Sequence, residues 1–283
     1  MGQDRTNPSG GTLPVVRLGD RMVSRLIAGY NPVDGHSHAT PALSQHMREY
    51  FTVERVVEYL RHCEELGINT FQFDHSKKVD AALRVLYEQG SALQYICLHT
   101  DSPDNPDEAP VKHIVSFKPI ALVHHGGVAD SRFREGQAGK IHDFVKRSHD
   151  LGAMAAVSTH IPENLMRMEE EGWEADFYMT CLHHLTRTRD EMVKEFGSVV
   201  VDEPFLEGDR DKMAAAIRQV RRPCLVFKIL AAGRRCGSQD TVGQAFKWAF
   251  DNIKATDAVI VGMYPQFQDE VKLNVEHTLR HAG

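Results

Sequence analysis

Polar residues that can perform chemistry follow several apolar runs of this 283-residue chain, and histidine, with 16 copies, is prominent among them. In an extended strand, residues two positions apart lie on the same face. That spacing joins Gln72 with Asp74, Cys97 with His99, Ser158 with His160, and Cys181 with His183. If these faces point into one cavity, several imidazoles and a carboxylate meet there, where imidazole can bind metal or carry protons near neutral pH.

A divalent metal site is the first chemical hypothesis. Its predicted ligands are Asp74, His99, His125 and His183, because neutral imidazole and carboxylate are common ligands of zinc, iron and manganese. A bound ion would polarise a carbonyl group or lower the pKa of a bound water molecule. No H-x-H or H-E-x-x-H spacing connects these residues, and each histidine has the alternative of being a hydrogen-bonded residue of the cavity wall.

Two further side chains are candidates for proton transfer. His160 ends the run AAVSTH, and Lys228 lies in the apolar segment VFKIL. Burial of Lys228 in a cavity would lower its pKa and allow Schiff-base formation or general-base catalysis. A lysine without a covalent role is the favoured interpretation of Lys228, and Cys181 is most simply a buried packing residue.

Eight apolar runs are predicted to be strands, and the segments between them to carry helices. The runs are Leu26–Asn31, Ile68–Asp74, Leu93–Asp101, Ile120–His125, Ala153–His160, Ala175–His183, Cys224–Leu230 and Ala258–Tyr264. The clearest helix is Val53–Leu66, where Thr52 is the predicted N-cap and Gly67 ends the helix. A short hairpin is predicted around Gly19 and Asp20, ahead of the first run.

Strands that alternate with helices predict a parallel α/β fold, and eight such units predict a (β/α)8 barrel with an N-terminal β-hairpin. Residues 1–11 are predicted to form a flexible N-terminus and residues 12–283 a single barrel domain. A doubly wound open sheet is the alternative, but no G-x-G-x-x-G sequence opens a predicted helix. Because a parallel barrel places its chemistry at the carboxyl ends of its strands, the polar residues above are expected at one mouth.

The charge and composition of the chain argue against nucleic acid and membrane as binding partners. A net charge of −6 without a block of Lys and Arg argues against nucleic-acid binding. No apolar stretch approaches the ~18 residues of a membrane span, so no membrane partner is expected. The five cysteines form no C-x-x-C pair, which favours a reducing cytoplasm. The start MGQDRTNPSGG lacks a hydrophobic signal region, so a periplasmic protein would require a leader that was removed.

Several segments together resemble the aldo/keto reductase superfamily. They are LPVVRLGDRMVSRL, GINTFQFD, IALVHHG, GKIHDFVKRSHDLGAMAAVSTHIPENL, FKILAAG and DAVIVGMYPQFQDEVKLNV, in an order and spacing that cover nearly the whole chain. The resemblance implies a barrel with NADPH across its mouth and a tetrad of Asp, Tyr, Lys and His that reduces carbonyl groups.

Most residues of the family's catalytic tetrad have no matching residue in this sequence. The family's Asp falls on Gln72, with Asp74 two residues further along the same face, and its Lys falls on His99. The Tyr has no counterpart, because DHSKKVDAAL leads almost directly from strand to helix. Only the His is retained, as His125. The resemblance therefore implies a divergent member without the usual proton donor.

The positions that contact the cofactor in the family are matched only in part by this sequence. Ser158 matches the serine that contacts the nicotinamide amide, and Glu270 with Asn274 matches the closing E-x-x-x-N at the adenine end. The basic residues that bind the 2′-phosphate have no match in YPQFQDEV. Arg234 and Arg235 follow FKILAAG, where the loops of such barrels can bind an anion, although solvated surface charge is the favoured interpretation.

These observations predict a barrel enzyme that acts on a small polar carbonyl compound or a sugar-derived metabolite. The leading hypothesis is metal-assisted lyase, isomerase or hydrolase chemistry, with Lys228 or His160 handling protons. One alternative is an NAD(P)H-dependent oxidoreductase with His125 or His99 as the acid, and another is a non-catalytic barrel that binds a ligand. The sequence leaves the substrate, the metal and the oligomeric state open.

Overall fold

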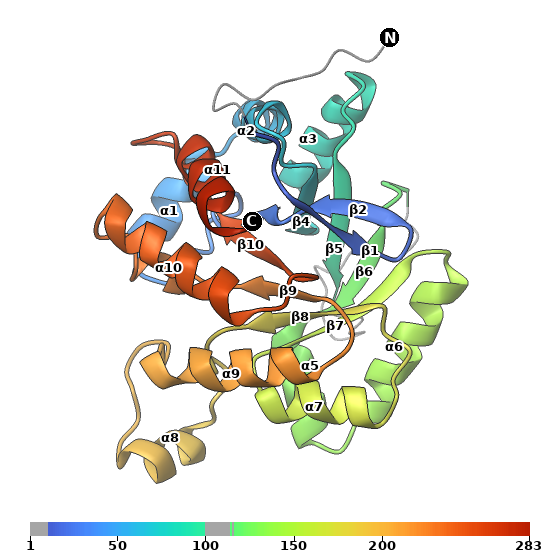
Figure 1. Cartoon of the computed structure of the whole chain (residues 1–283), viewed down its shortest axis with the longest axis vertical. Helices are drawn as coiled ribbons and strands as arrows, with labels where there is room; N and C mark the ends of the chain where they lie inside the picture. The colour runs from blue at the N-terminus through green and yellow to red at the C-terminus, as the bar shows by residue number, and fades with distance from the viewer. Residues whose placement is uncertain (1–10, 100–113, 115) are drawn as a thin grey trace.

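The computed structural model describes residues 11–99, 114 and 116–283, and it contains a closed eight-stranded parallel barrel (Figure 1). Residues 1–10, most of the predicted flexible N-terminus, lie outside the described residues. The barrel strands are β3 (Leu26–Gly29), β4 (Thr70–Asp74), β5 (Gln94–His99), β6 (Ala121–His124), β7 (Met154–Thr159), β8 (Phe177–Cys181), β9 (Cys224–Phe227) and β10 (Ala258–Gly262), and β10 pairs with β3 to close the barrel. The predicted (β/α)8 barrel with an N-terminal hairpin is confirmed.

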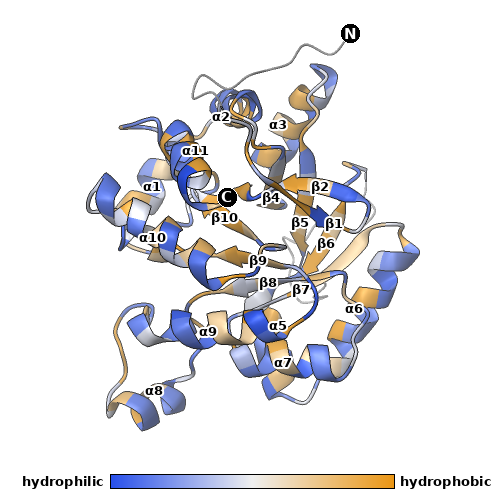
Figure 2. Ribbon diagram, viewed as in Figure 1, coloured by the Kyte–Doolittle hydropathy of each residue, from blue (hydrophilic) through white to orange (hydrophobic). Residues whose placement is uncertain are grey.

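The helices surround the barrel, with apolar residues concentrated on the strands (Figure 2). They are α1 (Pro41–Tyr50), α2 (Val53–Glu65), α3 (Lys77–Glu88), α5 (Gly126–Arg134), α6 (Ala138–Asp150), α7 (Pro162–Glu170), α8 (Arg189–Phe196), α9 (Glu207–Gln219), the 3-10 turn η1 (Ala231–Gly233), α10 (Gln239–Asn252) and α11 (Glu270–His281). Thr52 caps α2 as predicted, because its side chain accepts a hydrogen bond from the backbone N–H of Arg55. None of the described helices is both long and apolar enough to cross a bilayer.

The N-terminal hairpin closes one end of the barrel. Its strands are β1 (Val15–Leu18) and β2 (Arg21–Ser24). Val16, Leu18 and Val23 belong to the same buried cluster as the inward side chains of the barrel strands. The hairpin sits at the amino ends of the strands, where the Gln94 side chain donates a hydrogen bond to the carbonyl of Met22. The carboxyl ends of the barrel strands lie at the opposite end, where parallel barrels place their active sites.

The register of the strands decides which polar residues face the interior. Neighbouring residues in a parallel register share a face. Ile96 lies in the interior cluster and pairs with Gln72, and Leu98 pairs with Asp74. Gln72 and Asp74 therefore face inward. His99 belongs to the opposite face, which packs against the helices, so its expected position in the mouth is corrected.

Candidate active site at the barrel mouth

A histidine and a buried carboxylate form a pair at the exit of β7. His160 continues the inward face of β7, and Asp130 lies on α5, which packs against that strand. Nδ1 and the backbone N–H of His160 both bond to Oδ2 of Asp130, at 2.9 and 3.1 Å. The side chains of Thr159, Asn164 and Thr186 donate further hydrogen bonds to the same carboxylate, at 2.5, 3.0 and 3.0 Å. The carboxylate is thus fixed in position.

The pair has a defined protonation pattern. Burial alone raises the pKa of Asp130, but hydrogen bonds from His160 and Thr159 outweigh burial and hold this pKa below its ordinary value. An ionised carboxylate only accepts hydrogen bonds, so Nδ1 of His160 carries a proton. Within the described residues no hydrogen bond engages Nε2, which is the lone-pair nitrogen of neutral His160. This is the arrangement of a general base oriented by a carboxylate.

A cavity of about 400 Å³ opens beside His160. That volume suits a small metabolite. Its wall includes Cys181 and His184 from the exit of β8. Arg187 and Asp209 brace the wall through a bidentate ion pair, with N to O distances of 2.8 and 2.6 Å, and both side chains are buried. His160 therefore faces a preformed space, and Asp130 lies behind it.

Lys228 is a second candidate group at the mouth. It follows β9 in the left-handed backbone region, with φ of 62°, which costs about 1–3 kcal/mol for a residue other than glycine. Its Nζ lies 5.5 Å from the centroid of the Phe205 ring, and no hydrogen bond engages Nζ in the part of the chain that the structure describes. Burial lowers the pKa of Lys228, although Cys181 and Glu203 oppose that effect. A lowered pKa increases the neutral, nucleophilic fraction of the amine.

His125 and Cys181 lie beside these groups. Burial, with His160 nearby, lowers the pKa of His125 to about 4, so its imidazole is neutral near pH 7. Its Nδ1 is buried, and it has no hydrogen-bond partner among the described residues. Burial raises the pKa of Cys181 to about 12, so this thiol remains protonated and is a poor nucleophile. His125 consequently places a neutral imidazole, with a buried nitrogen that no described residue engages, next to His160.

The predicted metal ligands are not brought together. The ring of His99 stacks on Phe144 of α6, with centroids 6.2 Å apart. His183 lies two residues beyond the end of β8, and its Nδ1 bonds to the carbonyl of Leu206 at 3.2 Å. Asp74 accepts a hydrogen bond from the backbone N–H of His75. No group of three His, Cys, Asp or Glu side chains in the described residues is arranged to hold a metal ion, so the donor set does not fit the predicted site.

The predicted cofactor residues fit NADP in part. Ser158 faces inward on β7, two residues before His160 and on the same face of the strand. Glu270 Oε2 accepts a hydrogen bond from the backbone N–H of Tyr264 at 2.7 Å, so this carboxylate is used within its own loop. Asn274 is buried on α11. The residues 263–274 contain a single basic residue, Lys272, which leaves the 2′-phosphate without an evident partner there.

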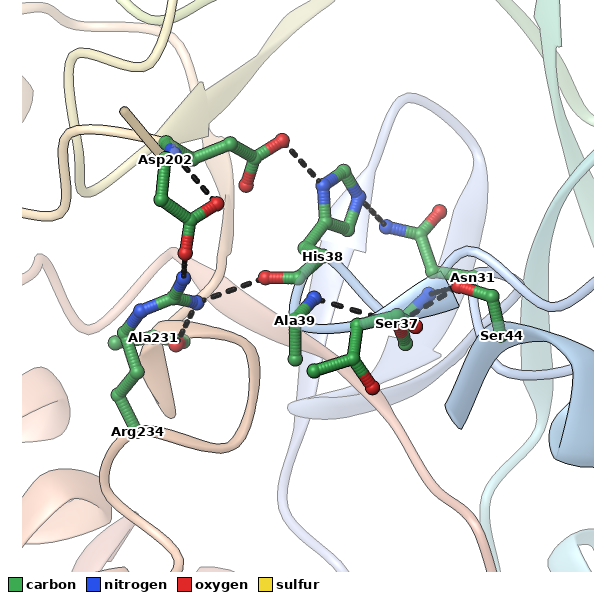
Figure 3. A network of polar contacts seen from close by, with 10 residues as sticks. Asn31, Ser37, His38, Ala39, Ser44, Asp202, Ala231 and Arg234 are labelled. Carbon is green, nitrogen blue, oxygen red and sulfur yellow. Dashed lines mark hydrogen bonds and ion pairs between the residues drawn. The ribbon is translucent and has the colours of Figure 1, made fainter. Parts of the chain in front are cut away.

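Loops that follow three different strands are tied together by polar contacts (Figure 3). His38, after β3, bonds through Nδ1 to Oε1 of Glu203 at 2.7 Å, and Glu203 lies between β8 and β9. Arg234, after β9, donates to the carbonyl of His38 at 2.9 Å and to Asp202 at 3.1 Å. The His38 ring also contacts the Asn31 amide at 3.1 Å. We call these contacts the His38–Glu203 latch.

Asp130 and Gly126 are candidate site residues that the sequence patterns did not single out. Asp130 is 30 positions from His160, and no spacing rule connects a helix residue to the exit of the next strand. The signal that was present is GG directly after the predicted strand IALVHH. Gly126 matters because a Cβ there would lie 2.8 Å from Ser158 Oγ and 2.9 Å from His160 Cε1.

Gly126→Ala is expected to displace the His160 ring. Contacts below 3.0 Å force either Ser158 or His160 to move, and a shift of about 1 Å at a catalytic group can cost ~10²-fold in rate. The free energy of unfolding should fall by ~1–3 kcal/mol from overpacking. Gly139→Ala on α6 is the matched control, because its Cβ meets nothing within 4 Å. Equal activity of the two variants would contradict the proposed packing.

Acid is expected to destabilise the fold through buried neutral histidines. Burial lowers the pKa to about 3 for His124, about 4 for His125 and about 4 for His183. Arg132 Nη1 lies 2.6 Å from Nε2 of His124, which requires that nitrogen to accept. The unfolded chain, with a histidine pKa of about 6.5, binds more protons below that pH. The contribution of the three neutral histidines to the free energy of unfolding is therefore full above about pH 6.5 and is lost as the pH falls towards 4.

Urea unfolding measures this loss. Three such histidines predict a decrease of ~4 kcal/mol in the free energy of unfolding between about pH 7.5 and about pH 5.5. An unchanged free energy of unfolding across that interval would show that the imidazoles titrate alike in both states.

Comparisons with solved structures agree on the fold. A putative aldo-keto reductase from Pseudomonas aeruginosa is 15% identical over 99% of this chain and 98% of its own, with a TM-score of 0.56. A glycerol dehydrogenase from Gluconobacter oxydans is 13% identical over 94% and 95%, with a TM-score of 0.53. A truncated 3-deoxy-D-arabino-heptulosonate 7-phosphate synthase from Thermotoga maritima is 15% identical over 95% and 91%, with a TM-score of 0.55.

No protein-family model matches the sequence, and no curated protein matches it. Identities of 11–15% show the fold alone. The (β/α)8 barrel predicted from the sequence is confirmed at that level, and the aldo/keto reductase resemblance stays a resemblance. These three neighbours are described as enzymes, and two of them as a reductase and a dehydrogenase.

Proposed function

We propose that this barrel is an enzyme of the lyase or isomerase type that acts on a small polar carbonyl compound. His160, oriented by Asp130, transfers the protons, and Lys228 holds the carbonyl group. The observation that carries the proposal is the His160 imidazole, fixed by the buried Asp130 carboxylate at 2.9 Å and facing a cavity of about 400 Å³. A carboxylate-oriented imidazole is suited to general acid–base catalysis near neutral pH.

The proposed reaction begins at Lys228. The neutral amine adds to the carbonyl carbon, and one proton passes from nitrogen to the former carbonyl oxygen. Protonated His160 gives its proton to the departing hydroxyl group, so that water leaves and an iminium ion remains. Neutral His160 then removes a proton from the adjacent carbon. Return of a proton to the opposite face of the same carbon re-forms an iminium ion, now of the epimer, and addition of water to that ion releases the epimeric carbonyl compound and the free amine.

Metal-assisted chemistry, the leading hypothesis from the sequence, has weaker support than this route. Its ligands were to be Asp74, His99, His125 and His183, and the described residues do not gather these donors. No step of the proposed reaction therefore passes through a metal ion. That the reaction requires a metal ion remains a prediction, which the deuterium-exchange experiment below tests by adding a chelator.

The oxidoreductase remains as the second candidate function. It is supported by the inward position of Ser158 beside His160, where a nicotinamide amide would be bound in the family that the sequence resembles. His125 would then be the nearest polar side chain to a reacting carbonyl, although its lowered pKa makes it a hydrogen-bond partner rather than an acid near pH 7.

Deuterium exchange separates these functions. A panel of small hydroxyaldehydes, hydroxyketones and oxo acids is incubated with the protein in D2O, and loss of the proton next to the carbonyl is followed by NMR. The proposal expects exchange without any added cofactor and in the presence of a chelator. Loss of exchange in chelator would favour the metal-assisted route. Consumption of a compound only with NADPH would favour the oxidoreductase, and no change in any arm would favour a ligand-binding barrel.

A further inference from the structure

A second cavity, of about 380 Å³, lies between α9 and α10 and is lined by three arginines. Arg210 comes from α9, and Arg234 and Arg235 come from the turn after η1. Thr241, Gln244 and Trp248 of α10 complete the wall. The first turn of α9 separates this space from the cavity beside His160, because Asp209 lines the one and Arg210 the other.

The three guanidinium groups are partly buried rather than spread over the surface. Their side chains are 18%, 32% and 25% exposed for Arg210, Arg234 and Arg235. Arg210 lies over the Trp248 ring, with its Cζ 4.3 Å from the centroid. Arg234 and Arg235 were expected to be solvated surface charge. Arg234 is an exposed residue and Arg235 is partly buried, and both also line this cavity.

In the described chain, the lining of the cavity contains three cations and no carboxylate. Glu207 pairs with both Arg210 and Arg235, and Asp202 pairs with Arg234. Two further carboxylates act from outside the lining, Asp211 on Arg210 and Glu203 on Arg234. Burial, and then the nearby charge of Arg235, lowers the pKa of Arg210, and Nε of Arg210 is buried without a partner among the described residues. The cavity wall therefore presents guanidinium groups to a ligand, with one donor unused.

The carboxylates are weak competitors for a ligand. The side chains of Glu207 and Asp202 are 66% and 63% exposed, and exposed ion pairs typically contribute less than about 1 kcal/mol. A phosphate group has enough oxygens to contact three guanidinium groups at once, which one carboxylate cannot do, and guanidinium presents its donors in the planar fork that phosphate oxygens match.

We infer that the cavity lined by Arg210, Arg234 and Arg235 is a binding site for a phosphate group. The site lies between α9 and α10, whereas Glu270 and Asn274 belong to α11, so it is separate from the positions predicted for NADP. It is also independent of the acid–base chemistry at His160. The ligand is either free phosphate or the phosphate monoester of a small molecule.

Titration calorimetry of the full chain tests the site, with inorganic phosphate, glycerol 3-phosphate, sulfate and chloride as probes. Arg210→Gln and Arg235→Gln are each expected to weaken phosphate binding by at least about tenfold. Arg55→Gln is the matched control, because it removes an i,i+3 ion pair with Glu58 on α2, and it should change the affinity by less than about twofold. Tighter binding of glycerol 3-phosphate than of phosphate assigns a monoester, and the reverse assigns the free ion.

Tryptophan fluorescence gives a readout that does not depend on the arginine variants folding. The chain has two tryptophans, and Arg210 covers Trp248. Phosphate should change the emission of the unmodified protein, and Trp248→Phe should remove that change while leaving the emission of Trp173. No binding up to ~20 mM phosphate, equal competition by chloride, or affinity unaffected by both arginine variants would overturn the site.

Discussion

Asp130→Asn is expected to lower the rate of proton exchange at the substrate carbon by about 10²–10⁴-fold. The asparagine amide nearly preserves the shape of the carboxylate but removes its charge. Its NH2 group cannot accept the proton of His160 Nδ1, so the imidazole is driven to the wrong tautomer or turns away. Of the five hydrogen bonds that Asp130 receives from the described residues, two come from His160 itself. The loss should therefore appear in kcat rather than in substrate affinity.

Two comparisons make this result specific. Asp143→Asn on the exposed side of α6 should leave the exchange rate unchanged. The double variant Asp130→Asn with His160→Gln should lose little more than His160→Gln alone, because residues that act as one unit are not additive. Circular dichroism confirms that each variant is folded. A fully active Asp130→Asn would mean that Asp130 only supports the local structure.

Lys228→Met is expected to abolish turnover and covalent capture together. Sodium borohydride reduces an iminium ion to a secondary amine, so treatment of the protein with a turned-over carbonyl compound should add the mass of that compound to Lys228. The amine is prepared for this role by burial and by the absence of a hydrogen bond to Nζ in the described residues. Loss of the covalent route should cost at least ~10³ in rate, or ~4 kcal/mol.

Lys247→Met is the matched control for this prediction. Lys247 is 60% exposed and pairs with Asp251 on α10, so its removal should affect neither activity nor capture. Borohydride modification of a different lysine, or undiminished turnover by Lys228→Met, would rule out the iminium ion. Exchange would then depend on His160 alone.

The strands and helix α2 were predictable because buried runs and helix signals are local. All eight predicted runs contain a barrel strand, and Thr52 caps α2 as expected. The inward face was harder to predict. Strands of a parallel barrel are apolar on both faces, so the pair Cys97 and His99 looks the same as Ser158 and His160 in sequence. Only the register with neighbouring strands shows that the first pair faces the helices.

The proton-transfer pair was only half predictable. His160 was a candidate because it ends an apolar run, whereas Asp130 depends on α5, a helix inserted between β6 and α6 that brings its carboxylate over the next strand. His183 failed as a mouth residue for a related reason. The chain has already left β8 at that position, so strand alternation no longer determines where the ring points.

The His38–Glu203 latch has a kinetic consequence. Because its members follow β3, β8 and β9, those three loops can separate only if the contacts to Glu203 and Asp202 break together. Concerted loop rearrangements of this kind take microseconds to milliseconds. Opening of these loops would then limit product escape and the maximal velocity. Added salt, by screening the ion pair between Arg234 and Asp202, would make the catalyst faster while weakening its hold on the reactant.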